Sequence, residues 1–139
     1  MGKINWRRVL LGGLLAGVVI NVVESVVYGV ILKRQWQAAM EALGKSPKPG
    51  GMWILVAVGF FMGVVAIWLY AAIRPRFGPG PKTALYAGLC VWALAYLTTV
   101  LGSTPMGVFP NTLMFMLAAV GLIEAPLATI VGAWAYREA

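Results

Sequence analysis

The sequence predicts an all-α integral membrane protein, in which four transmembrane helices form an antiparallel bundle and an amphipathic helix follows the first span. The chain of 139 residues is 61% hydrophobic and only 11% charged. That is more apolar surface than a soluble core of this size hides from water. The apolar residues fall into four runs long enough to cross a bilayer as helices, at residues 9–32, 52–73, 84–101 and 112–136. The length leaves room for one membrane domain, residues 1–139.

The first run follows Lys3, Arg7 and Arg8, an arrangement that is also typical of a secretory signal peptide. The hydrophobic part of a signal peptide has roughly 7 to 15 residues, whereas this run continues to Leu32. It also has no convincing small-x-small cleavage site. We therefore expect residues 9–32 to be retained as the first span.

Residues 33–44 carry too much charge to cross a membrane, but their apolar residues recur at helical spacing. Trp36, Ala39 and Met40 share one face, while Lys33 and Arg34 lie on the other. This pattern predicts an interfacial amphipathic helix that continues the first span and ends at Gly44. An anchor in the lipid headgroups is favoured over a ligand lid.

The connector at residues 74–83 reads RPRFGPGPKT, and its glycines and prolines predict a tight, non-helical turn between the second and third spans. With an internal N-terminus, seven basic residues lie on the cytoplasmic side and four on the other. The inner set is Lys3, Arg7, Arg8, Arg74, Arg76, Lys82 and Arg137, and the outer set is Lys33, Arg34, Lys45 and Lys48. The positive-inside rule thus favours both termini in the cytoplasm.

Several classes of function are disfavoured by what the chain lacks. Histidine is absent and Cys90 is the only cysteine, so the usual ligands of haem and zinc and the usual general base are missing. We expect no catalytic set, no cofactor and no metal site. The basic residues flank the apolar runs instead of forming one polar face, which argues against nucleic-acid binding and indicates contact with lipid headgroups.

Two acids, Glu24 and Glu124, lie within apolar runs that contain no basic residue. A carboxylate in hydrocarbon is costly, so each marks a candidate ion- or proton-binding site. Glu24 shares a helical stripe with Asn21 and Tyr28, which either line a path or simply satisfy the acid between helices. Glu124 lies among small residues and precedes Pro126, which frees the carbonyl group of Leu122.

If the first and fourth spans are neighbours, the two acids can share one site. Two unpaired carboxylates in apolar surroundings do not both stay ionised, so the pair would take up a proton, a cation or a basic partner. Trp92 and Tyr96 share a face of the third span and either line a pocket or serve as packing. Helix packing is expected at small residues, namely Gly13, Gly17, Gly59, Gly63 and Gly121.

Two families resemble this chain. The stretch YGVILKRQWQAAMEALG, residues 28–44, resembles an uncharacterised family of four-span bacterial membrane proteins, which implies the same four-span layout and a bacterial inner membrane. The chain is also similar to the small multidrug resistance transporters, which have four spans and an essential glutamate in the first. Glu24 and Lys33 are the matching positions, whereas the long connector after the first span and the second acid, Glu124, depart from that pattern.

These observations favour a small proton- or cation-coupled transporter or channel that uses Glu24 and Glu124. The alternative is a non-catalytic accessory or scaffold subunit of a larger membrane complex. Four short spans enclose little volume, so a homo-oligomer or a partner membrane subunit is expected in addition to the lipid bilayer.

Overall fold

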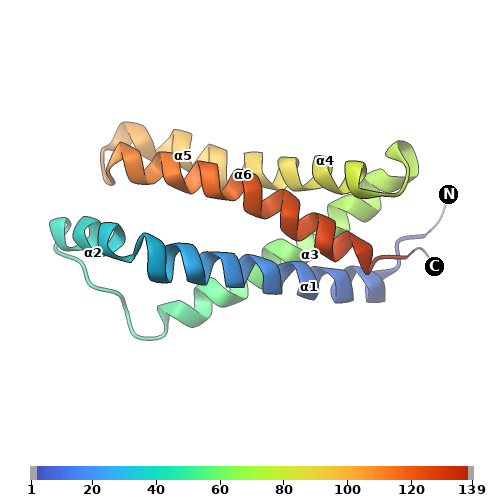
Figure 1. Cartoon of the computed structure of the whole chain (residues 1–139), viewed down its shortest axis with the longest axis horizontal. Helices are drawn as coiled ribbons and strands as arrows, with labels where there is room; N and C mark the ends of the chain where they lie inside the picture. Colours follow the sequence, from blue (N-terminus) through green and yellow to red (C-terminus); the bar gives the residue numbers. More distant parts are fainter. Residues whose placement is uncertain (1–2, 138–139) are drawn as a thin grey trace.

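The computed structural model, which describes residues 3–137, is a bundle of four long helical spans with a short helix after the first (Figure 1). The described residues contain no strand. All four spans are long and apolar enough to cross a membrane. They are Trp6–Ile31, Gly51–Phe77, Pro81–Met106 and Asn111–Trp134. The predicted fold class is confirmed.

The first span consists of α1 (Trp6–Val26) and a π-helical segment, η1 (Val27–Ile31). The side chain of Asn5 caps α1 by accepting a hydrogen bond from the Arg8 N–H at 3.2 Å. The helix α2 (Lys33–Ala42) follows directly and ends before Gly44, which has a φ of +62°. The predicted helix at 33–44 is therefore present, and its place at a membrane surface stays a prediction.

The second span is a single helix, α3 (Gly51–Phe77), and it corrects the prediction of a non-helical connector at 74–83. Helix α3 runs through Pro75 and ends at Gly78, whose N–H bonds to the Arg74 carbonyl at 2.8 Å. Proline is tolerated in membrane helices because neighbouring helices, polar side chains, water and local adjustments of the helix satisfy the backbone groups that it frees. The turn is thus only residues 78–80, where Gly78 and Gly80 have φ values of +83° and +127°.

The third span combines four pieces: α4 (Pro81–Trp92), the π-helical η2 (Ala93–Leu97), α5 (Thr98–Ser103) and the 3₁₀ turn η3 (Thr104–Met106). Pro81 begins α4 at a position where its missing N–H costs nothing. The fourth span is α6 (Asn111–Trp134), which contains Pro126. The spans thus start and end a few residues away from the predicted limits.

The four spans form a ring in the order α1, α3, α4, α6, because α1 packs on α3 and α6, and α4 packs on the same two helices. Residues 5 and 136 meet at one end of the bundle, where the Asn5 N–H donates to the Tyr136 hydroxyl at 3.3 Å. In Figure 1, α1 and α6 are close at this end and diverge toward the end that carries α2. The larger buried core includes Val9, Ala16, Ile20, Ile67, Tyr70, Ala84, Ala87 and Ala128.

Glycines allow the helices to approach closely. A Cβ atom on Gly13 would lie 2.6 Å from the Cα of Val64, and one on Gly63 would meet backbone atoms of Gly13 and Gly17. A Cβ atom on Gly59 would meet the amide of Asn21. The motifs Gly13-x-x-x-Gly17 and Gly59-x-x-x-Gly63 therefore pack against each other across the α1–α3 contact, as small residues do in membrane helices.

Candidate carboxyl and tyrosine site

Four titratable side chains from three spans form one cluster, which we call the carboxyl–tyrosine cluster: Glu24, Tyr28, Tyr96 and Glu124. Glu24 and Glu124 lie near enough to interact electrostatically, and Tyr28 and Tyr96 each interact with both acids. The sequence left open whether the first and fourth spans are neighbours, and the structure shows that α1 packs on α6. That contact brings the two acids into one site.

Glu124 is the most deeply buried member, with only 1% of its surface exposed. Neither of its carboxyl oxygens reaches hydrogen-bond geometry with another group of residues 3–137. The Tyr96 hydroxyl lies near this carboxyl group, but it also has no well-formed hydrogen bond within the described chain. A buried carboxyl group in this state is open to a proton, an ion or water.

Packing on α6 determines where Tyr96 lies. A Cβ atom on Gly121 would come within 2.5 Å of the Tyr96 ring, so only glycine leaves room for the ring at this position. Gly121 precedes Glu124 by three residues and shares its helix face. The expected packing role of Gly121 is therefore specific: it lets a tyrosine of the third span reach the acid of the fourth.

Both tyrosines lie in π-helical segments, Tyr28 in η1 and Tyr96 in η2. In η1, the Leu32 N–H bonds to the Val27 carbonyl, and in η2 the Thr98 N–H bonds to the Ala93 carbonyl, five residues back in each case. In an α-helix the Thr98 N–H would donate to the Leu94 carbonyl. Here the Thr98 hydroxyl donates to that carbonyl instead. π-Helical turns of this kind are rare and occur often at functional sites.

The fourth span adds a third irregularity near the same acid. Pro126 has no N–H to donate to the Leu122 carbonyl. The segment is packed tightly against α4, since a Cβ atom on Gly88 would lie 2.5 Å from the Cα of Pro126. The first and third spans thus contain a π-helical turn beside the cluster, and the fourth, a continuous α-helix, lacks one backbone donor there.

Two predicted pocket residues have other partners. The amide of Asn21 donates to the Gly17 carbonyl at 2.8 Å and to the Val56 carbonyl of α3 at 3.2 Å. It lines a shallow groove between α1 and α3 rather than the cluster. The indole N–H of Trp92 donates to the Ala118 carbonyl at 2.8 Å, so this side chain joins α4 to α6. For Trp92 the geometry agrees with the packing interpretation, whereas the amide of Asn21 donates to backbone carbonyls and not to Glu24.

An aromatic group lies at the α2 side of the cluster. Trp36 of α2 packs edge-to-face on Tyr28, with ring centroids 6.0 Å apart, and on Phe109, with centroids 5.4 Å apart. Tyr28 therefore joins the carboxyl–tyrosine cluster to α2, and Trp36 extends this contact to the connector before the fourth span. The sequence placed Trp36 on the apolar face of a helix, but nothing in its spacing indicated these ring contacts.

The structure thus defines a helical membrane bundle with a paired-carboxyl site among three spans. No known family model, curated protein or solved structure matches the chain. The arguments about function therefore depend on the residues themselves.

Proposed function

We propose that the protein is a proton-coupled transporter or a proton channel in which Glu24 and Glu124 carry the proton. The observation that supports this most is the fully buried, unpaired carboxyl group of Glu124 beside a second acid. A buried carboxylate without a cationic partner costs several kcal/mol. A site in which such a group lies beside a second, half-buried carboxyl group therefore binds and releases a cation more readily than it stays doubly charged.

The side-chain ligands available near the cluster favour binding of a proton over binding of a metal cation. Metal cations such as Na⁺ or Ca²⁺ need several oxygen ligands that converge on one point. Among residues 3–137, no group of three or more His, Cys, Asp or Glu side chains has a geometry that could hold a metal ion.

Flux measurements on reconstituted protein test this proposal. Purified protein is reconstituted into vesicles, and an electrical potential is applied across the vesicle membrane. Proton entry is then followed with a pH-sensitive dye trapped inside the vesicles. We expect Glu124→Gln to abolish most proton flux and Glu24→Gln to reduce it, while Glu41→Gln on the exposed face of α2 leaves it unchanged. Equal flux in the wild type and the two buried-acid variants would overturn the proposal.

The accessory-subunit alternative is favoured by one feature of α3. Met52, Trp53, Ile54 and Leu55 are between 59% and 76% exposed, and consecutive helix residues point in different directions, so no part of the described chain covers this end of α3. A partner helix or a second copy would fit there as well as lipid. Recovery of only a lone monomer after gentle detergent extraction would argue against this alternative.

For the location, we propose a bacterial inner membrane with both termini in the cytoplasm. The support is the charge difference between the two ends of the bundle and the resemblance to four-span bacterial membrane proteins. The glycine motifs of α1 and α3 pack against each other, so these faces are not available to a partner helix.

A further inference from the structure

Helices α1 and α6 are joined tightly in the half of the bundle that lies away from α2. A Cβ atom on Gly12 would lie 2.6 Å from the Gly132 carbonyl oxygen, and one on Gly132 would lie 2.5 Å from the Gly12 carbonyl oxygen. The apolar core continues from this contact toward the two acids through fully buried residues, namely Ala16, Ile20, Ile67 and Ala128. Close apolar packing therefore separates the carboxyl–tyrosine cluster from the end that carries residues 3 and 137.

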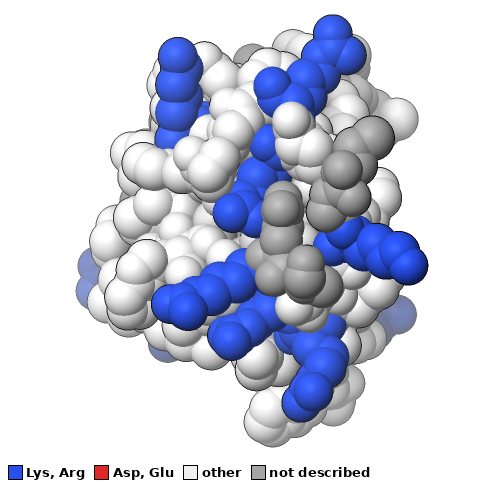
Figure 2. All heavy atoms as spheres, turned by 90° about the vertical axis from the view of Figure 1, so that its right-hand side faces the viewer, with Lys and Arg blue, Asp and Glu red and all other residues white. Residues whose placement is uncertain are grey.

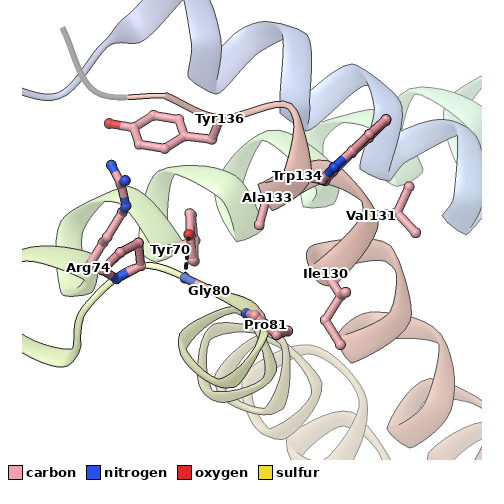
Figure 3. Close-up of a pocket in the computed structure, with 10 residues that line it drawn as sticks. Tyr70, Arg74, Gly80, Pro81, Ile130, Val131, Ala133, Trp134 and Tyr136 are labelled. Carbon is pink, nitrogen blue, oxygen red and sulfur yellow. Dashed lines mark hydrogen bonds between the residues drawn. The ribbon is translucent and has the colours of Figure 1, made fainter.

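The end beyond this packing is basic, and Figure 2 shows Lys and Arg side chains spread around it. A pocket of about 600 Å³ opens there, between the turn at residues 78–80 and the last turns of α6 (Figure 3). The described residues that line it include no member of the carboxyl–tyrosine cluster. Tyr70, which does line it, accepts a hydrogen bond from the Gly80 N–H at 3.2 Å. The positive charge of this end disfavours the approach of a proton, and its pocket does not reach the acids.

The half of the bundle toward α2 differs, because unpaired polar atoms lie between α2 and Glu124. Five buried side-chain atoms there have no hydrogen-bond partner within residues 3–137, namely Trp36 Nε1, the hydroxyl oxygens of Tyr28 and Tyr96, and both carboxyl oxygens of Glu124. Buried polar atoms are nearly always bonded to protein or to ordered water. A buried water molecule makes about three hydrogen bonds, and these atoms offer both donors and acceptors for it. This side therefore suits a short chain of water molecules that ends at Glu124.

Tyr28 lies between α2 and the acids. Its ring packs edge-to-face on Trp36 of α2, with centroids 6.0 Å apart, and it interacts electrostatically with Glu24 and Glu124. A phenol hydroxyl both donates and accepts a hydrogen bond, so it can pass a proton on, whereas an indole N–H only donates. Both rings are half-buried, so a single layer of side chains separates the Tyr28 hydroxyl from the surface.

We propose that protons reach Glu124 from the α2 end of the bundle, with the Tyr28 hydroxyl as a relay and the Trp36 ring over its entrance. In each transfer the Tyr28 oxygen accepts a proton from water on its α2 side and releases its own hydroxyl proton toward the acids. Tyr28 stays neutral, and the Glu124 carboxylate becomes a carboxyl group. This inference rests on the proposed function, because it names the route by which the proton-binding group is loaded.

Infrared spectroscopy of the reconstituted protein tests this route without a transport assay. The membranes are transferred from H₂O to D₂O at acidic pH, and exchange of the Glu124 carboxyl proton is followed by the shift of its C=O stretching band. That band is assigned by its absence in Glu124→Gln. We expect Tyr28→Phe to slow the exchange about tenfold or more, because a positioned proton-transfer group typically accelerates the step by about 100-fold and water replaces it only in part.

Tyr70→Phe is the matched control, since it removes a hydroxyl group from the basic end of the bundle, and it should exchange at the wild-type rate. Trp36→Ala keeps the Tyr28 hydroxyl and removes the ring beside it, so it should speed the exchange even if Tyr28→Phe proves unstable. The wild-type rate in Tyr28→Phe or in Trp36→Ala, or equal slowing in Tyr70→Phe, would overturn the proposal. Slower exchange in Tyr28→Phe, together with no Glu124-dependent proton flux in wild-type vesicles, would support the route and overturn the proposed transport, so the two failures can be told apart.

Discussion

Glu124 occupies a position that an apolar side chain of similar length would fill at a lower free-energy cost. Its carboxyl group is buried, and no group of the described chain forms a well-made hydrogen bond with it. A buried polar group left without partners costs about 1–3 kcal/mol. Such a cost is expected where a residue is kept for its chemistry rather than for stability. This interpretation can be tested apart from any transport assay.

We expect Glu124→Met to raise the free energy of unfolding by about 1–3 kcal/mol, because it removes the unpaired oxygens and keeps the packing volume. The free energy is measured by denaturation with SDS in mixed micelles. Glu41→Met on the exposed face of α2 is the control and should change little. A clear loss of stability in Glu124→Met would instead show that the carboxyl group is structural.

Gly63 tests the contact between the two glycine motifs. A Cβ atom there would overlap backbone atoms of Gly13 and Gly17, so the helices must move apart. We expect Gly63→Ala to destabilise the protein by about 1–3 kcal/mol, as overpacking does in well-packed cores. Gly102→Ala is the matched control, because nothing lies within 4 Å of the added methyl group. Equal melting temperatures for the two variants in detergent would contradict the close α1–α3 contact.

At the scale of elements, the π-helical segments bring Tyr28 and Tyr96 to the acids. The extra residue in a π turn changes the direction of the side chains that follow it, so a regular α-helix would present different residues at this depth. In η2, the Thr98 hydroxyl donates a hydrogen bond to the Leu94 carbonyl. The shape of the site thus depends on hydrogen bonds within a single helix.

Thr98→Val should weaken η2, because it keeps the shape of the side chain and removes the hydroxyl donor. We expect a loss of about 0.5–1.5 kcal/mol in the free energy of unfolding, the usual net value of one hydrogen bond. A larger fractional loss of proton flux than of folded protein would show that η2 also shapes the site. Thr112→Val, in the exposed first turn of α6, should leave both measurements unchanged.

Comparison of the elements shows what the sequence predicts and what it does not. The four spans, α2 and the contact of Gly13-x-x-x-Gly17 with another small-residue stripe follow from apolar length, helical period and residue size. The continuation of α3 through Pro75 does not follow from them. The free-energy cost of a proline depends on whether the carbonyl group that it frees finds water or another hydrogen-bond partner. The π turns at η1 and η2 depend on a small balance of backbone hydrogen bonds that residue types do not reveal.

The same limit applies to the site. Glu24 and Glu124 stand out in the sequence because charge is rare in apolar runs. The partners of Asn21 and Trp92 cannot be recognised in the sequence, because each side chain donates to a backbone carbonyl of a neighbouring helix. The carbonyl belongs to Val56 in one case and to Ala118 in the other. Backbone carbonyls are present at every residue, so only the helix arrangement selects them.

At the scale of the whole molecule, the two ends of the bundle differ in charge and in packing. Seven basic residues surround the end where Asn5 meets Tyr136, and α1 and α6 lie close together there (Figure 1). The opposite end, which carries α2, has four basic residues, and the first residues of α3 there lack protein neighbours in the described chain. This difference predicts a single preferred orientation of the protein in a membrane, which is a measurable property.

Labelling of single cysteines in whole cells tests the orientation. Cys90 is first replaced by alanine, which removes the only thiol of the chain. One cysteine is then introduced at Lys82, in the turn beside α4, or at Lys45, after α2. A maleimide that does not cross membranes should label the position 45 variant in intact cells and the position 82 variant only after the cells are opened, because the seven-residue basic end remains in the cytoplasm. The reverse pattern would place the termini outside, and labelling of both positions in intact cells would indicate mixed orientations, as in an antiparallel dimer.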